Sequence, residues 1–325
     1  MTTLTDRFGR HFPYLRMSLT EACNYRCGYC LPDGYDGPSR GFLTRGEIGR
    51  LLRAFVALGM SKLRLTGGEP SLRRDLVDVI ADAAALPGIR KIAMTTNGVV
   101  LARRVADWHA AGLTALNVSI DSLDAVRFAA VTGFDHHAQL LDGIEHSLGL
   151  GFASVKLNAV LLRGVNDDEL DAWLEYVRPR ALSVRYIELM RTGENADYFA
   201  RHHLPASTIA AQLLSRGWSR TERAFDAGPA VEYAHPDYAG RIGLIAPYAP
   251  NFCAGCNRLR VTARGDLRLC LFGEFGVPLR DLLQSDDDGE TLRARIAQQL
   301  GLKAAGHDLH RGNTGITPHL ASVGG

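Results

Sequence analysis

The stretch KLRLTGGEPSLRRDLVDVIADAAALPG, residues 62–88, contains a strand pattern, a glycine-rich turn and a helix pattern in direct succession. Its first six residues form a short, largely apolar run that is typical of a strand. From Arg73 onward, apolar residues recur at helical spacing until Pro87 and Gly88 end the pattern. The stretch therefore predicts one βα unit with the turn GGEP, residues 67–70, at the carboxyl end of its strand.

The same unit recurs between residues 14 and 190. Strand patterns occupy residues 14–20, 62–67, 91–97, 115–121, 154–162 and 183–189, and helix patterns occupy residues 44–60, 73–88, 101–112, 137–151 and 167–179. Repeated βα units predict a parallel sheet, either doubly wound or rolled as a barrel, and six units are too few to close an eight-unit barrel. In both architectures the carboxyl ends of the strands form the ligand site, and here they read TGGEP, TTNG and SIDS.

The pattern changes after about residue 190. A helix is predicted over 206–216, antiparallel strands over 241–247, 258–263 and 267–272, and a terminal helix over 290–300, before a glycine-rich tail. The turn RGD, residues 264–266, joins the last two strands. We therefore expect an α/β domain over residues 1–230 and an α+β extension over residues 231–325.

The composition is that of an ordinary globular protein, with 46% apolar and 22% charged residues in 325. A formal net charge of +2 provides no basic field for nucleic acid, so we expect no nucleic-acid partner. The first twenty residues contain no apolar stretch of signal-peptide or membrane-spanning length. We therefore expect a cytoplasmic protein without a membrane partner.

Six cysteines form two triplets, and the first has the spacing C-x3-C-x2-C at Cys23, Cys27 and Cys30. Three thiolates can hold three irons of a four-iron cluster and leave the fourth iron open to a small ligand, whereas electron-transfer clusters use four cysteines. A zinc ion with a fourth ligand from elsewhere is the alternative. Disulfides are disfavoured in a reducing compartment.

The second triplet, Cys253, Cys256 and Cys270, again lacks a fourth cysteine. A structural zinc site on a hairpin is the stronger alternative here, although no histidine lies at ribbon spacing within the triplet. On the strand after Cys256, alternation places Arg258 and Arg260 on one face. Arg268 and Cys270 share a face of the return strand in the same way, but the sequence leaves the register between the two strands open.

Cations also occupy the predicted strands of the βα units, where a half-buried face would normally be apolar. They are Arg16, Lys62, Arg64, Lys156 and Arg185. Each one alone is most often a surface charge. Together with the arginines of the hairpin, they predict a site for a polyphosphate, because guanidinium groups bind phosphates in bidentate fashion.

The first triplet, with Tyr29 before its last cysteine and GGEP at the next strand end, resembles the radical S-adenosylmethionine (SAM) superfamily. The resemblance implies an incomplete (βα)6 TIM-like barrel, a [4Fe-4S] cluster on the first triplet, and SAM bound to the open iron. It assigns SAM contacts to Tyr29, Gly67, Gly68, Glu69, Thr96, Asn97, Ser119 and Asp121. Glu69 would accept a hydrogen bond from the methionyl ammonium, and the polar strand-end residues serve equally well as turn or cap residues.

A narrower resemblance covers nearly the whole chain. CNYRCGYCLP, LRLTGGEPSLRRD, NVSIDSLD, CAGCNRLRVTARGDLRLCLF and the terminal GG resemble, in this order, the GTP 3′,8-cyclase (MoaA) family of molybdenum cofactor biosynthesis. The resemblance implies conversion of GTP to 3′,8-cyclo-7,8-dihydro-GTP, a second [4Fe-4S] cluster on the second triplet, and guanine at its open iron. The implied triphosphate contacts are Arg16, Lys62, Arg64, Lys156, Arg185, Arg258 and Arg260, and the tail Gly324-Gly325 would enter the active site.

The family also implies partners: a reductant such as flavodoxin or ferredoxin, a MoaC-like protein that takes the product, and a second copy in a homodimer. Two other functions stay open at this point. One is a different radical SAM enzyme with an auxiliary cluster, and the other is a non-catalytic zinc protein.

Overall fold

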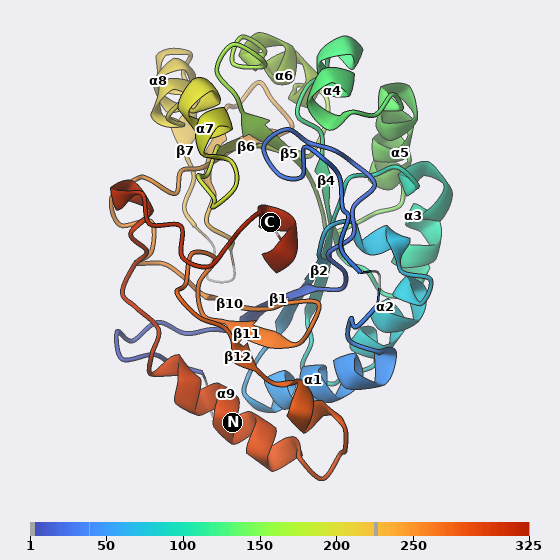
Figure 1. Cartoon of the computed structure of the whole chain (residues 1–325). Helices are drawn as coiled ribbons and strands as arrows, with labels where there is room; N and C mark the ends of the chain where they lie inside the picture. The colour runs from blue at the N-terminus through green and yellow to red at the C-terminus, as the bar shows by residue number, and fades with distance from the viewer. Residues whose placement is uncertain (1–3, 39, 224–226, 325) are drawn as a thin grey trace.

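The computed structural model describes residues 4–38, 40–223 and 227–324 of the chain. Its centre is a single curved sheet in the order β12-β11-β10-β1-β2-β3-β4-β5-β6-β9-β8-β7 (Figure 1). The strands of the described residues are β1 Tyr14–Ser18, β2 Lys62–Thr66, β3 Lys91–Thr96, β4 Ala115–Ser119, β5 Ser154–Leu161, β6 Ser183–Glu188, β7 Ser219–Arg220, β8 Val231–Ala234, β9 Arg241–Ile245, β10 Arg258–Val261, β11 Asp266–Arg268 and β12 Val277–Pro278. All six strands predicted for the βα units are present, as β1 to β6, and neighbouring pairs are parallel.

Helices cover the outer, convex side of the sheet (Figure 1). They are α1 Arg45–Ala57, α2 Leu76–Ala84, α3 Leu101–Ala110, α4 Ala125–Thr132, α5 His137–Gly149, α6 Leu170–Val177, α7 Ala196–His202, α8 Ser207–Ser215 and α9 Gly289–Leu300, with short 3-10 turns η1 Pro70–Leu72, η2 Arg280–Leu283, η3 Leu309–Arg311 and η4 Leu320–Val323. The predicted helices correspond to α1, α2, α3, α5, α6, α8 and α9. In the part of the chain that the structure describes, no helix has the length and apolar character needed to cross a bilayer.

The C-terminal strands extend the same sheet at both edges. β10 runs parallel to β1, and β9 runs parallel to β6, so eight parallel strands lie side by side, and no described strand pairing joins β9 to β10. The prediction of antiparallel strands in this region is right for β11 beside β10 and for β9 beside β8, but wrong for the inner sides of β9 and β10. The reason is the apolar face that β10 shares with β1, since Leu259 lies opposite Leu15 and Val261 opposite Met17.

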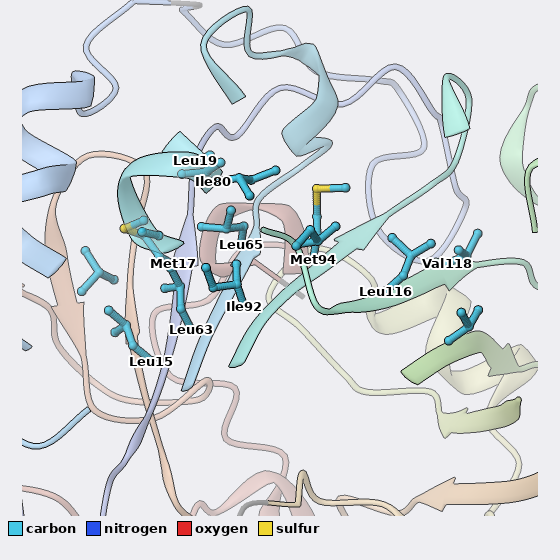
Figure 2. Packing of buried hydrophobic residues seen from close by; sticks show 14 of the residues in the cluster. Leu15, Met17, Leu19, Leu63, Leu65, Ile80, Ile92, Met94, Leu116 and Val118 are labelled. Carbon is cyan, nitrogen blue, oxygen red and sulfur yellow. The ribbon is translucent and has the colours of Figure 1, made fainter. Parts of the chain in front are cut away.

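The outer face of the strands forms the core. Odd-numbered residues of β1 and β2, including Leu15, Met17, Leu63 and Leu65, are fully buried and pack with Ile80 of α2 (Figure 2). This face alternates with polar and charged residues that point to the inside of the curve, as strand geometry requires. The inner face therefore carries the candidate site.

Helix α1 connects the first βα unit to the C-terminal extension. It begins at a capping box, in which the Thr44 hydroxyl accepts from the Glu47 amide and the Glu47 carboxylate accepts from the Thr44 amide. The same carboxylate accepts hydrogen bonds from Arg280 and Gln284 in and after η2. These bonds fix the C-terminal extension to the first βα unit.

Two helices were not predicted. Helix α4 begins where Asp124 accepts from the amides of Val126 and Arg127, and it ends at Gly133, whose φ is 69°. These residues carry the cap signals of a helix N-terminus and C-terminus. Apart from Arg127 and Thr132, the eight residues of α4 are apolar, so they show no helical period, and α7 has only seven residues.

Candidate active site

A cavity of about 1070 Å³ occupies the inside of the curved sheet. It is lined by Cys23, Cys27 and Cys30 of the first triplet and also by Phe252, Gly255 and Arg258, which lie next to Cys253 and Cys256 in the chain, but not by the cysteines of the second triplet. Sites for one small ligand usually measure roughly 300–1,000 Å³, so this cavity has room for a nucleotide and a second small ligand together. The first triplet therefore lines this space directly, whereas the second triplet reaches it only through neighbouring residues.

The first triplet lies in a loop directly after β1. The amides of Cys30 and Leu31 donate to the carbonyl of Cys27 at 2.9 and 3.0 Å, which closes a tight turn around the thiols. Within this loop, the buried Tyr25 hydroxyl contacts the Asn97 carbonyl at 3.1 Å and His136 Nε2 at 2.5 Å. The loop is therefore fastened to the segments after β3 and before α5.

Burial raises the pKa of the first-triplet thiols. It brings the pKa of Cys23 to about 11 and that of Cys30 to about 12, and the nearby Asp121 charge also raises the pKa of Cys27. A bound cationic centre would favour the thiolates that these environments otherwise disfavour. The three cysteines are free, so no disulfide competes for them.

Each triplet offers three free thiols as possible metal ligands. Among the described residues, no three His, Cys, Asp or Glu side chains lie close enough to hold one metal ion. A single zinc ion would need its thiolates at about 2.3 Å from one point. Three free thiols on one short loop are the donor set that a [4Fe-4S] cluster with one open iron would take.

The predicted SAM residues gather around the first triplet. Glu69 is buried and joins two strand ends, since its carboxylate accepts from Thr96 Oγ1 at 2.8 Å and from the amides of Asn97 and Ser71 at 2.7 and 2.9 Å. Burial raises its pKa. A carboxylate has about four acceptor positions, so one stays available for an ammonium group. Glu69 does not line the cavity, unlike Thr96 and Asn97.

The glycines of GGEP are required by packing against the chain itself. A Cβ on Gly67 would lie 2.3 Å from the Thr20 carbonyl oxygen, and one on Gly68 would lie 2.2 Å from that of Ala22. The amides of Gly68 and Glu69 donate to these same carbonyls at 2.8 Å. The two glycines therefore hold GGEP against the segment that leads into the first triplet, in addition to lining the cavity.

Tyr29 and Asp121 form a pair at the cavity wall. The Tyr29 hydroxyl donates to Asp121 Oδ2 at 2.9 Å, and the Val160 amide donates to Asp121 Oδ1 at 2.8 Å. Burial raises the pKa of Asp121 to about 6. Ser119 lies two residues earlier on β4 and faces the same cavity. These positions agree with a ligand between the strand ends and the first triplet.

Four arginines lie directly opposite one another across neighbouring strands. The register places Arg268 of β11 opposite Arg260, Arg260 opposite Arg16, and Arg16 opposite Arg64. This settles the register that the sequence left open, with even positions paired. Like charges opposite one another destabilise a sheet, so a bound anion would stabilise this row.

Of the seven predicted triphosphate residues, six line the cavity: Arg16, Lys62, Arg64, Lys156, Arg185 and Arg258. The exception is Arg260, whose guanidinium contacts the C-terminal tail instead. Further cations that the sequence analysis did not single out are Lys91, Arg220, Arg223 and Arg241, and the carboxylates of described residues that line the cavity are Asp121, Glu222 and Glu232. Among the described residues, cations therefore outnumber carboxylates in this lining.

Cations of this lining act on Tyr14, which the sequence analysis missed. Burial raises its pKa, but the charges of Arg64, Arg16 and Lys62 outweigh burial and lower it to about 7. Its hydroxyl accepts from Arg64 Nε at 2.5 Å, and Lys62 Nζ lies 4.7 Å from its ring centre. The signal was present, because Tyr14 precedes Arg16 by two residues and so shares its face.

At the other side of the cavity, Arg185 is held by Glu232 of β8. Arg185 Nε and Nη2 donate to Glu232 Oε1 at 3.0 and 2.5 Å, and Ser183 Oγ donates to Glu232 Oε2 at 2.7 Å. Burial and the charge of Arg185 lower the pKa of the adjacent Lys156 to about 7, although Glu232 raises it. Glu232 was not predicted, because the short sequence of β8, VEYA, contains no motif that indicates a binding site.

The C-terminal tail enters the inside of the sheet, as Figure 1 shows at the label C. The Gly324 carbonyl accepts from Arg16 at 2.7 Å, and the Val323 carbonyl accepts from Arg260 at 3.2 Å. Upstream, Thr317 accepts from Arg268 at 3.1 Å and donates to the Leu271 carbonyl. Gly325 lies outside the described residues.

The second triplet lies at the start of β10 and after the end of β11. The Cys256 amide donates to the Cys253 carbonyl at 3.0 Å, which closes a turn like that of the first triplet. Cys270 follows β11, which ends at Arg268, so the prediction that Cys270 lies on the return strand is wrong. Strand β11 ends at Arg268 because the backbone bends at residues 269–270.

Two family models match the chain. The model described as Radical SAM superfamily matches residues 17–177, and the model described as Molybdenum Cofactor Synthesis C matches residues 182–309. A GTP 3′,8-cyclase of Stenotrophomonas maltophilia (strain R551-3) is 66% identical over the full length of both chains, and one of Yersinia pestis is 54% identical over the full length of both. The chain belongs to the GTP 3′,8-cyclase family.

The fold agrees with membership of this radical SAM family. The crystal structure of Streptococcus suis SuiB bound to S-adenosylmethionine matches 96% of this chain and 77% of SuiB with a TM-score of 0.65, at 12% identity. This likeness concerns the fold and confirms the predicted radical SAM barrel. As a GTP 3′,8-cyclase family member, the chain is an enzyme of the radical SAM type, which confirms the first resemblance.

Proposed function

We propose that this chain binds GTP and SAM in one cavity and converts GTP to 3′,8-cyclo-7,8-dihydro-GTP for molybdenum cofactor biosynthesis. The observation that carries the proposal is the row Arg268, Arg260, Arg16 and Arg64, of which Arg16 and Arg64 line the same cavity as the first cysteine triplet. A bound triphosphate would place negative charge beside this row. The 66% identity to a protein named GTP 3′,8-cyclase supports the same substrate.

The first triplet would hold a [4Fe-4S] cluster, and SAM would bind beside it. When bound, this pair supplies the radical that starts the reaction. The chain's own residues would position these groups. Gly67 and Gly68 let the end of β2 lie close to the segment that leads into the first triplet, and Glu69 keeps one acceptor position for the methionyl ammonium. The hydrogen-bonded pair Tyr29 and Asp121 forms part of the cavity wall. Thr96, Asn97 and Ser119 complete the proposed contacts.

The strand cations would bind the triphosphate. Lys156 and Arg185 lie on adjacent strands, and Glu232 keeps the Arg185 guanidinium in place before the nucleotide arrives. Arg16, Lys62 and Arg64 lie on the opposite part of the wall, and Arg258 lies beside the second triplet. Bidentate contacts from these side chains would fix the ribose and base between the two triplets.

The second triplet would hold a second [4Fe-4S] cluster, and the guanine would bind at its open iron. Phe252 and Gly255 line the cavity next to these cysteines, so a flat base has a surface to rest on. The tail would then cover the nucleotide, because Gly324 already lies among Arg16, Arg260 and Thr66. Such a cover excludes water from a radical reaction.

The remaining parts of the proposal concern organisation and partners. We assign residues 1–230 to the barrel domain and residues 231–325 to the auxiliary-cluster region, although the latter shares the sheet. The reducing cytoplasm is supported by six free cysteines. A flavodoxin-like or ferredoxin-like reductant, a MoaC-like protein downstream and a homodimer are proposed from family membership alone.

The test uses protein reconstituted anaerobically with iron and sulfide, then mixed with SAM, a strong reductant, and either GTP or ATP. We expect 5′-deoxyadenosine and cyclised GTP by mass spectrometry with GTP and neither in quantity with ATP. Cys253→Ser should retain the first cluster but lose cyclisation. Deoxyadenosine formation that ignores GTP would support a different radical SAM enzyme, and zinc without acid-labile sulfide would overturn the proposal.

A further inference from the structure

A buried lysine lies next to the second triplet, and the proposed function does not use it. Lys303, which follows α9, is 3% exposed. Its ammonium donates to the Leu269 carbonyl, one residue before Cys270, and lies 5.2 Å from the ring centre of Phe12. No ion pair joins Lys303 to a carboxylate in the described part of the chain.

The loop that carries Lys303 wraps over the second triplet. A Cβ on Gly306 would lie 3.8 Å from the Cys253 sulfur. Arg10 fixes this loop, since its guanidinium donates to the carbonyls of Ala304, Ala305 and Cys253 at 2.6, 2.7 and 3.0 Å. Arg10 is itself paired with Asp6, so its charge is compensated and that of Lys303 is not.

The two triplets have different charged neighbours. The cations Lys303, Arg258 and Arg10 lie near Cys256 of the second triplet, whereas the carboxylate of Asp121 lies near Cys27 of the first.

A buried ammonium without a counter-charge is costly, so its retention needs a partner. Three thiolates on a [4Fe-4S]²⁺ core leave a negative assembly, which becomes more negative when it gains one electron. Nearby positive charge stabilises the reduced form and so raises the reduction potential. The missing partner of Lys303 is then the second cluster.

We propose that Lys303 is the counter-charge of the second cluster and keeps its reduction potential above that of the first cluster. The inference rests on the proposed function, which supplies the second cluster. The redox step is the transfer of one electron from an external one-electron reductant to the cluster, with no bond formed or broken. Lys303 acts as a positioning residue, because it touches neither substrate nor iron.

The test is a redox titration followed by electron paramagnetic resonance (EPR) on reconstituted full-length protein, with wild type, Lys303→Met and Lys303→Arg. The first cluster is recognised because added SAM changes its signal. In Lys303→Met we expect the ratio of reduced to oxidised second cluster to fall at least tenfold at fixed potential, which is about 59 mV for one electron. Lys303→Arg should retain the wild-type reduction potential of the second cluster. The reduction potential of the first cluster should stay the same in both variants.

Arg311→Met is the matched control, because Arg311 is an exposed cation of the same C-terminal region and its removal should move neither potential. A second readout is thermal unfolding of cluster-free protein, in which Lys303→Met should unfold at a higher temperature than wild type because an uncompensated buried charge is gone. If Lys303→Met does not fold, Lys303→Gln keeps a donor to Leu269 and serves in its place.

An unchanged second-cluster potential in a folded, fully loaded Lys303→Met protein would overturn this inference and leave the proposed function intact. Iron and sulfide contents that account for one cluster only in wild type, with a single EPR species, would overturn both. An equal shift in Lys303→Arg would also overturn the inference, because it would trace the effect to packing and not to charge.

Discussion

Arg260 and Arg16 lie opposite each other on the parallel strands β10 and β1, and both donate to the carbonyl oxygen of Gly324, at 3.4 and 2.7 Å. The pair therefore holds the tail, and two adjacent guanidinium groups are also suited to bind a polyphosphate. This relationship links the tail, the strand cations and the nucleotide in one small region.

The first prediction concerns polyphosphate binding by this pair. Inorganic tripolyphosphate should raise the unfolding temperature of the cluster-free protein, because a ligand at one hundred times its dissociation constant stabilises the folded state by about 2.7 kcal/mol. The double variant Arg16→Gln/Arg260→Gln should lose most of this rise, and added salt should reduce it in wild type. Differential scanning fluorimetry measures both effects.

Arg90→Gln is the control for this experiment, because Arg90 is an exposed cation outside the cavity. Its variant should respond to tripolyphosphate as wild type does. If Arg90→Gln lost the rise in unfolding temperature to the same extent, the stabilisation by tripolyphosphate would depend on the overall charge of the protein and not on the row of arginines.

The second prediction concerns the backbone of the tail. Gly324 has a φ of 71°, and a Cβ there would lie 2.3 Å from Thr66 Cγ2 and 2.7 Å from Ser18 Oγ. Gly324→Ala should displace the tail and lower the cyclisation rate at least tenfold, with little effect on global stability because the tail is the last element. The rate of GTP consumption and a urea unfolding curve give the two measurements.

Gly151→Ala provides the matched control. Gly151 has a similar φ of 78°, but nothing lies within 4 Å of its missing Cβ. The variant should lose about 1 kcal/mol of stability from backbone strain and keep its activity. If Gly324→Ala kept full activity, the tail would have no part in the reaction.

Much of this site was predictable because strand alternation and parallel pairing are local rules. Arg16, Lys62, Arg64, Lys156 and Arg185 were assigned from sequence alone to a phosphate site on the strands, and all five line the cavity. Pairing between distant segments was not predictable. The contact of β10 with β1 joins residues more than two hundred positions apart, and the partner of Arg185, Glu232, lies on a short strand whose sequence has no distinctive pattern.

The third prediction concerns the loop of the first triplet. Tyr25→Phe removes the contacts of the hydroxyl with Asn97 and His136, and it leaves a buried imidazole nitrogen without that partner. The free energy of unfolding of the cluster-free protein should fall by about 1–3 kcal/mol. Tyr35→Phe, which removes a hydroxyl from a less buried site, should change it by less than about 0.5 kcal/mol. Equal effects would argue against a structural role of the Tyr25 hydroxyl.

The fourth prediction concerns pH. Burial and Arg185 lower the pKa of Lys156 to about 7 from an ordinary value of 10.5, so at pH 8 the free protein holds Lys156 mostly neutral. A bound triphosphate favours the ammonium, so binding takes up a proton at this pH. The GTP affinity should therefore fall as pH rises above 7, by up to tenfold per pH unit.

The same shift affects folding in the opposite sense. Between pH 7 and 10.5 the unfolded chain binds more protons at this lysine than the folded chain, so the contribution of Lys156 to stability rises with pH in that window. Below pH 7, Lys156 is protonated in both the folded and the unfolded state. The folded state then bears the full free-energy cost of a buried charge among other cations. Ligand affinity and stability of the free protein thus change oppositely with pH.

Lys156→Arg separates this effect from the titration of GTP itself, because an arginine stays protonated throughout. We expect the affinity of this variant, measured by calorimetry in buffers of different ionisation enthalpy, to lack the proton uptake seen in wild type near pH 8. Glu232→Gln removes the carboxylate that raises the pKa of Lys156, so its affinity should begin to fall at a lower pH than that of wild type. Identical pH profiles in wild type and Lys156→Arg would show that Lys156 does not contact the triphosphate.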